Sequence, residues 1–183
     1  MRRSVFIIPM IFCILLMMHL TSYAASVDGF IGVPWGATQQ QIDSAMKEKG
    51  FPHHDFMPYY VGSFAGYTAR ALSFQLKHDS FYEGQASICH TEENSGHGEV
   101  RACSQKIVSM ISEKYGQPTG RKDTHRNAYC LYWEGLQNAG TSDKITIKVW
   151  TSIPDKLNGG IVQVTYTNNS LLERLKYKDK GDI

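Results

Sequence analysis

The feature that most constrains this fold is a set of three short runs in which apolar and polar residues alternate with a period of two. The runs are residues 128–134, 144–152 and 160–168, and turns that contain Gly or Asn separate them. Successive side chains of a strand point to opposite faces of a sheet. The runs therefore predict an antiparallel three-strand meander with one core face and one largely polar face.

The two phases of the meander have different chemistry. The core phase is expected to contain Tyr129, Leu131, Trp133, Ile145, Ile147, Val149, Val162, Val164 and Tyr166. The other phase contains Cys130, Tyr132, Thr146, Lys148, Trp150, Gln163 and Thr165. Large amphipathic aromatics among polar groups are typical of protein-binding surfaces, so Tyr132, Lys148 and Trp150 are candidate binding residues. The alternative is that a helix or the N-terminal half covers this face.

The preceding chain predicts helices that alternate with strands. A capping box formed by Thr38 and Gln41 begins a helix over 38–49, and Gly50 ends it. An edge strand near 56–62 and strands over 69–76 and 81–88 follow, with Tyr82 sharing a side with Ala86 and Ile88. A polar loop over 90–99, a helix over 100–115, a loop over 119–127 and, after the meander, a helix capped by Ser170 complete the order. This is an α+β fold: an antiparallel sheet built from two helix-then-strands halves, with helices packed on one face.

The N-terminal residues predict export. Arg2 and Arg3 precede an apolar run, and small residues flank a cleavage position after Ala24. This is the pattern of a signal peptide over 1–24, followed by a single domain over 25–183 in the periplasm or outside the cell. The alternative is an uncleaved anchor, but the run is shorter than the roughly 20 residues that a membrane span needs. We therefore expect no stable membrane span after cleavage.

Charge argues against nucleic acid as a partner. Without Arg2 and Arg3 the chain has 17 Lys and Arg against 17 Asp and Glu. It also lacks the stripe of basic residues that follows a phosphate backbone. We instead expect the partner to be another exported or envelope protein.

The cysteines beyond the leader predict one disulfide, because an oxidising compartment favours pairing. Cys89 and Cys103 flank one loop at a separation suited to a bridge; Cys89–Cys130 and Cys103–Cys130 are the alternatives. Cys89, His90, His97 and Cys103 are also zinc-ligand types, but their spacing matches no established finger. A disulfide would use both sulfurs, so no metal or other cofactor is expected.

Catalysis is not the favoured interpretation. A thiol- or metal-dependent hydrolase would use Cys130 with His125, or the loop between Cys89 and Cys103. No nucleophile elbow, phosphate loop or paired carboxylate motif supports this. A binding or inhibitor-like module without catalytic activity fits better. A further alternative is a small-ligand protein with a pocket under the aromatic-rich segment 52–66.

Three motifs carry a resemblance to a known class of proteins. They are VPWGATQQQIDSAM, MISEKYGQPTG and GGIVQVTYTNNSLLERL. The chain resembles uncharacterised bacterial periplasmic proteins and lipoproteins, and its architecture is similar to outer-membrane assembly lipoproteins and secreted β-lactamase inhibitor proteins. It departs from the lipoprotein members because it lacks a lipidated cysteine. The resemblance implies a small helix-plus-curved-sheet fold and an exported binding role.

Overall fold

The computed structural model describes residues 26–92, 96–125, 127–155 and 159–181 and has an α+β fold made mostly of sheet. The predicted signal peptide over 1–24 lies outside these residues. The elements are β1 (Gly29–Phe30), β2 (Val33–Pro34), α2 (Gln39–Glu48), β3 (Tyr60–Phe64), β4 (Tyr67–Lys77), β5 (Ser80–Ile88), α3 (His97–Tyr115), β6 (Gly120–His125), β7 (Ala128–Gln137), β8 (Lys144–Ser152), β9 (Ile161–Asn168) and α4 (Asn169–Gly181).

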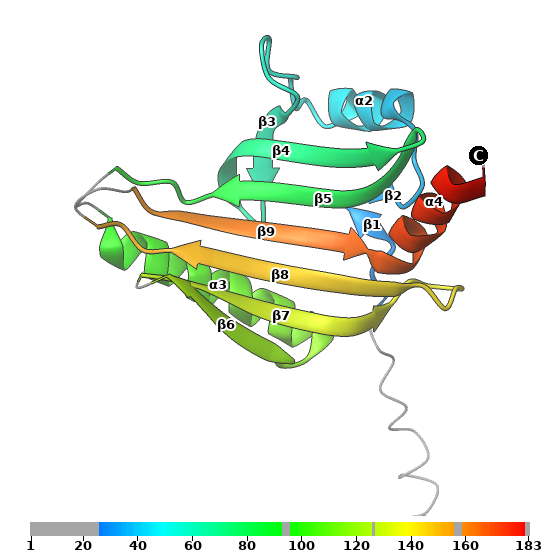
Figure 1. Cartoon of the computed structure of the whole chain (residues 1–183). Coiled ribbons are helices and arrows are strands. Elements are labelled where there is room, and N and C mark those ends of the chain that lie inside the picture. The colour runs from blue at the N-terminus through cyan, green and yellow to red at the C-terminus, as the bar shows by residue number, and fades with distance from the viewer. Residues whose placement is uncertain (1–25, 93–95, 126, 156–158, 182–183) are drawn as a thin grey trace, which may run out of the picture.

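One antiparallel sheet organises the fold. Its strand order is β3-β4-β5-β9-β8-β7-β6, while β1 and β2 form a separate two-stranded sheet (Figure 1). The β5–β9 pairing joins the N-terminal strands to the C-terminal ones. Each half is a helix followed by consecutive antiparallel strands, as the sequence predicts.

The N-terminal half begins with the predicted helix. Thr38 and Gln41 form both hydrogen bonds of the capping box. At the other end Gly50 has φ +68°, its amide donates to Lys47 O, and the Phe51 amide donates to Met46 O. These two bonds form a Schellman motif, which fixes where the chain leaves α2.

The strands of this half differ from the prediction in two details. The edge strand is confirmed, but it starts at Tyr60 because 52–59 forms a hairpin beside it. A bulge gives β5 one extra residue opposite Gln75 and Leu76, so the alternation of inward and outward side chains shifts by one at this point. Phe81 therefore enters the core and stacks on Trp35, while Tyr82 stays half-buried, so the predicted alignment of Tyr82 with Ala86 and Ile88 is wrong.

The C-terminal meander is confirmed. Six core-phase residues are at most 1% exposed: Trp133, Ile145, Ile147, Val149, Val162 and Val164. The helix α3 starts at His97, earlier than predicted, and packs against β8 and β9. In Figure 1 it lies behind β8 and β7.

The predicted loop over 119–127 is wrong, because Gly120–His125 is strand β6 at the sheet edge. Its residues are nearly all exposed, and Arg121, Lys122 and Asp123 follow one another along it. Charged side chains on an edge strand oppose pairing with other chains. The same charges make the strand look like a loop in the sequence.

The last helix is present but has a different cap. The amide of Leu171 donates to Asn168 Oδ1 at 2.8 Å, whereas Ser170 Oγ accepts from the Lys144 amide at 2.9 Å. The predicted Ser170 cap is therefore wrong: Asn168 caps α4, and Ser170 ties the helix to β8. Leu175 is buried, and Leu171 and Leu172 are only half-buried.

Candidate functional site

The register of the meander brings the three candidate binding residues together. Tyr132 lies directly opposite Lys148, and Trp150 lies two residues further along β8, opposite Cys130. Side chains two apart on one strand share a face. Tyr132, Lys148 and Trp150 therefore form one cluster, which we call the β7–β8 patch.

The β7–β8 patch lies on the sheet face opposite α3. Tyr132 and Trp150 are half-buried, and Lys148 is exposed. Figure 1 shows no helix across the middle of this face in the part of the chain that is drawn in colour, and α4 lies at one end of it. The indole Nε1 of Trp150 donates to Thr124 Oγ1 at 3.2 Å, which fixes the ring against β6. The patch is therefore an ordered aromatic surface that keeps contact with solvent.

Cys130 lies beneath this patch, and its surroundings do not activate it. The thiol is buried, its Sγ contacts Leu131 O at 3.8 Å, and burial raises its pKa, although Tyr132 and Lys148 act in the opposite direction. A thiolate nucleophile needs a lowered pKa and a neighbouring base. His125 instead lines a polar pocket with Tyr129, whose hydroxyl contacts Ser104 of α3 on the other face of β7. The structure does not bring Cys130 and His125 together.

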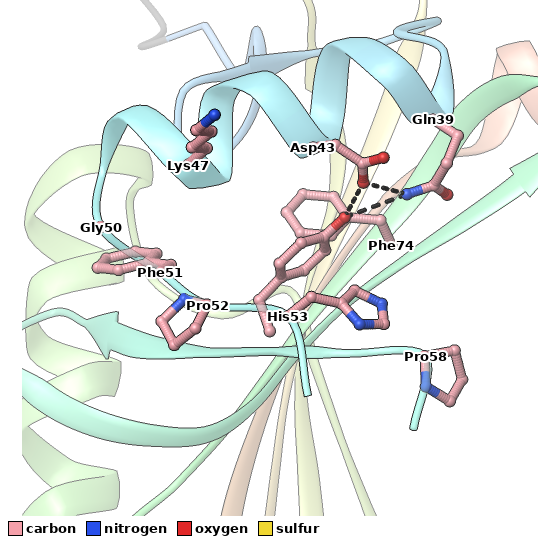
Figure 2. Close-up of a pocket in the computed structure, with 10 residues that line it drawn as sticks. Gln39, Asp43, Lys47, Gly50, Phe51, Pro52, His53, Pro58 and Phe74 are labelled. Atoms are coloured by element: carbon pink, nitrogen blue, oxygen red, sulfur yellow. Dashed lines mark hydrogen bonds between the residues drawn. The ribbon is translucent and has the colours of Figure 1, made fainter. Parts of the chain in front are cut away.

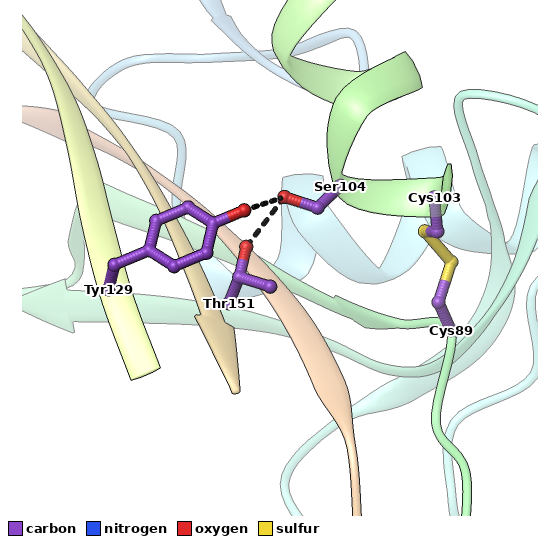
Figure 3. The surroundings of a disulfide bond; sticks show 5 residues. All are labelled: Cys89, Cys103, Ser104, Tyr129 and Thr151. Carbon is purple, nitrogen blue, oxygen red and sulfur yellow. Dashed lines mark hydrogen bonds between the residues drawn. A yellow bond between two sulfur atoms is a disulfide. The ribbon is translucent and has the colours of Figure 1, made fainter. Parts of the chain in front are cut away.

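The predicted Cys89–Cys103 disulfide is confirmed, with a Cα–Cα distance of 6.4 Å (Figure 3). The next residue, Ser104, is fully buried, and its Oγ lies 2.7 Å from Thr151 Oγ1 and 3.1 Å from Tyr129 OH. The disulfide thus holds the first turns of α3 to the end of β5, and the hydrogen bonds of Ser104 hold them to β7 and β8. Both loop sulfurs are consumed, and no group of three or more metal-ligand side chains occurs among the described residues.

The second candidate site is a concave one and lies beside α2 (Figure 2). It has a volume of about 910 Å³, within the range of roughly 300–1,000 Å³ that small-molecule pockets occupy. Phe51, Pro52, His53, Pro58, Tyr60 and Phe74 supply rings, and Gln39, Asp43, Lys47 and Gly50 complete the lining. We call this the α2 groove.

The α2 groove was only partly predictable. The ring-rich segment 52–66 suggests a pocket, and five of the lining residues lie in or next to it. The α2 residues and Phe74 were missed, because only the tertiary fold brings them to this segment. The sequence does contain a signal that could have identified the α2 residues. Gln39, Asp43 and Lys47 are spaced by four residues and form one exposed polar stripe along the helix.

The comparisons with known proteins give no relative. No protein-family model, curated protein or solved structure matches this chain. No helix among the described residues is both long and apolar enough to cross a membrane.

Proposed function

We propose that this chain is an exported protein-binding module without catalytic activity, and that it binds its partner through the β7–β8 patch. The observation that carries this proposal is the placement of Tyr132, Lys148 and Trp150 on a sheet face without a covering helix in the described chain. Half-buried Tyr and Trp side chains supply large contact area at a low entropic cost. Helix α3 packs against β8 and β9 on the opposite face, so the middle of this face is left for a partner.

The charges beside the β7–β8 patch indicate what kind of surface the partner presents. Lys122 lies opposite Cys130 and Lys148 lies opposite Tyr132, so two exposed ammonium groups flank the aromatic side chains. Neither lysine forms an ion pair with a described carboxylate. An acidic surface of another exported or envelope protein is complementary to this arrangement, and such complementarity chiefly raises the association rate.

Export rests on the N-terminal sequence and on the disulfide. The Arg-led apolar run has the pattern of a signal peptide, and disulfides persist in oxidising compartments. The resemblance to periplasmic proteins and inhibitor proteins points the same way. We therefore place the proposed interaction in the periplasm or outside the cell.

Site-directed photo-cross-linking tests the proposed surface in the native compartment. A photoreactive side chain replaces Trp150 in one variant and Met110, which is 42% exposed on α3, in a control variant. We expect one discrete cross-linked protein from position 150 and none from position 110. The same product from both positions, or none from either, would overturn the proposal.

The purified pair then tests the chemistry of the interface. Trp150→Ala should weaken binding at least tenfold, as expected of a central aromatic anchor. Lys148→Glu should slow association and reduce its salt dependence, because it removes attraction to an acidic partner. Phe56→Ala is the matched control, because Phe56 is 89% exposed and lies outside the patch. Unchanged binding by Trp150→Ala would contradict the patch.

A further inference from the structure

The α2 groove has an aromatic floor. Tyr60 is buried, and its ring meets Phe74 edge to face at a centroid distance of 5.7 Å. His53 meets Tyr60 in the same way at 5.0 Å. Phe51 and two prolines extend this apolar surface. Such a surface suits a flat aromatic or other apolar body.

The wall on α2 carries two opposite charges with different hydrogen bonding. Asp43 Oδ1 accepts from Gln39 Nε2 at 2.8 Å and from the Tyr60 hydroxyl. Figure 2 shows these bonds at one end of the groove. The carboxylate is thus already stabilised by two donors within the protein.

Lys47 lies one helical turn from Asp43, at the i, i+4 spacing that ordinarily favours an ion pair. No such pair forms, and Lys47 makes no ion pair with any carboxylate in the described ranges. Lys47 is one of the residues that line the groove and its side chain is exposed, so the flexible chain can bring its ammonium group to a ligand there. The α2 groove therefore combines an aromatic floor with one available cation.

We propose that the α2 groove binds a small amphipathic anion, with an aromatic or apolar body on Tyr60 and Phe74 and a carboxylate-type head at Lys47. A cationic ligand is the opposite possibility, since Asp43 retains a second oxygen. The anion is favoured because two donors already occupy Asp43 Oδ1, whereas Lys47 has no acidic partner among the described residues. This activity is independent of the β7–β8 patch, which uses other strands.

Three probes with the same phenyl ring and propyl chain separate these cases: phenylpropionate, phenylpropanol and phenylpropylamine. We would titrate each into the purified protein and follow amide chemical shifts by NMR. We expect millimolar binding, typical of fragments of this size, with the largest shifts at Gly50 and the side-chain amide of Gln39. The propionate should bind about two- to fivefold more tightly than the alcohol, and the amine most weakly.

A matched pair of charge variants completes the test. Lys47→Gln should abolish the advantage of the propionate over the alcohol. Lys49→Gln removes the same charge two residues away, outside the groove lining, and should retain the advantage. Tightest binding by the amine, equal binding by all three probes, or no shifts at the groove would overturn the proposal. Trp150→Ala should not alter probe binding, so failure here and failure of the protein-binding role are distinguishable.

Discussion

The two halves of the molecule share an order of elements but use it differently. In the C-terminal half a 19-residue helix, α3, lies against the meander. In the N-terminal half a 10-residue helix, α2, leaves a groove of about 910 Å³ beside β3 and β4. The same helix-then-strands plan therefore gives a long helix closely tied to its strands in one half and a short helix with a large groove beside it in the other.

Different ties to the sheet account for this contrast. The helix α3 is held by the Cys89–Cys103 disulfide and by the buried Ser104 hydroxyl. The helix α2 is held by two buried apolar side chains, Ile42 and Met46, and by the hydrogen bond from the Tyr60 hydroxyl to Asp43. A binding site needs side chains that are not already used in packing the fold. Helix α2 is shorter than α3 and has fewer bonds to the sheet, so it leaves such side chains exposed.

The largest expected effect tests whether the C-terminal half is the more tightly packed one. Trp133 is 1% exposed, and its Nε1 donates to Gly116 O at the end of α3. Trp133→Ala should lower the free energy of unfolding by about 3–5 kcal/mol, because it leaves a cavity and an unpaired carbonyl. Phe74→Ala, at the half-buried floor of the α2 groove, should cost about half as much. Urea unfolding followed by circular dichroism measures both, and equal losses would contradict the contrast.

The disulfide gives the second largest effect. Joint replacement by Cys89→Ala and Cys103→Ala should lower the free energy of unfolding by about 3 kcal/mol, the chain-entropy value for a loop of this length. Hydrogen exchange should show α3 amides less protected than in the parent protein, while α2 amides change little. Cys130→Ala is the control, since that thiol is outside the bridge. Faster exchange in α2 than in α3 after bridge removal would mean that Ser104 alone secures α3.

Local signals explain what the sequence could predict. The capping box at Thr38, the left-handed Gly50 and the alternation along β7, β8 and β9 all depend on neighbours within a few residues. The disulfide was predictable because its two cysteines flank one loop. These features position the β7–β8 patch, so that its residues could be named from the sequence.

Long-range pairing explains what the sequence could not predict. Strand β6 is defined by β7, and its charged residues resemble a loop when read alone. Asn168 and Ser170 are both good capping residues, and contact with β8 decides between them. The α2 groove needs Phe74 to lie near α2, which only the folded sheet achieves.

A smaller effect concerns α4, which joins the two halves. Arg174 donates two hydrogen bonds to Asp143 at 2.6 and 2.9 Å, next to β8, while Asp179 pairs with Lys77 and His78 at the β4–β5 turn. The hydrogen bonds from Arg174 hold the pKa of Asp143 below its ordinary value of 3.8, with Asn168 assisting and burial opposing. Asp143→Asn should therefore cost about 1–2 kcal/mol at neutral pH.

The pH dependence of this contact follows from the lowered pKa. Its contribution is complete above the ordinary carboxyl pKa and is lost as the pH falls through the lower value of the folded state. Unfolding free energies measured from neutral pH into the acid range should converge for the parent and Asp143→Asn. Asp179→Asn is the control at the exposed end of the helix and should have a smaller effect. A constant difference down to the lowest pH would exclude Asp143 ionisation as its cause.

The smallest expected effect on stability concerns the hydroxyl groups of two tyrosines, one in each half. Burial raises the pKa of Tyr60, with Asp43 adding to the shift, and burial also raises the pKa of Tyr166. Each phenol therefore stabilises the folded protein only while it is protonated. This contribution to the free energy of unfolding is complete below the ordinary pKa of 10.0 and is lost as the pH rises towards the pKa of the folded state. Tyr60→Phe should cost about 0.5–1.5 kcal/mol, because Asp43 loses one of its donors.

Spectrophotometric titration at alkaline pH checks this prediction. The parent protein should have one more late-ionising tyrosine than Tyr60→Phe, because the variant lacks the phenol with the raised pKa at position 60. The variant should also leave the aromatic floor of the α2 groove in place, because only the hydroxyl is removed. If Tyr60→Phe retains as many late-ionising tyrosines as the parent, Tyr60 is accessible to hydroxide through the groove, and the N-terminal half is more open than the contacts of Tyr60 imply.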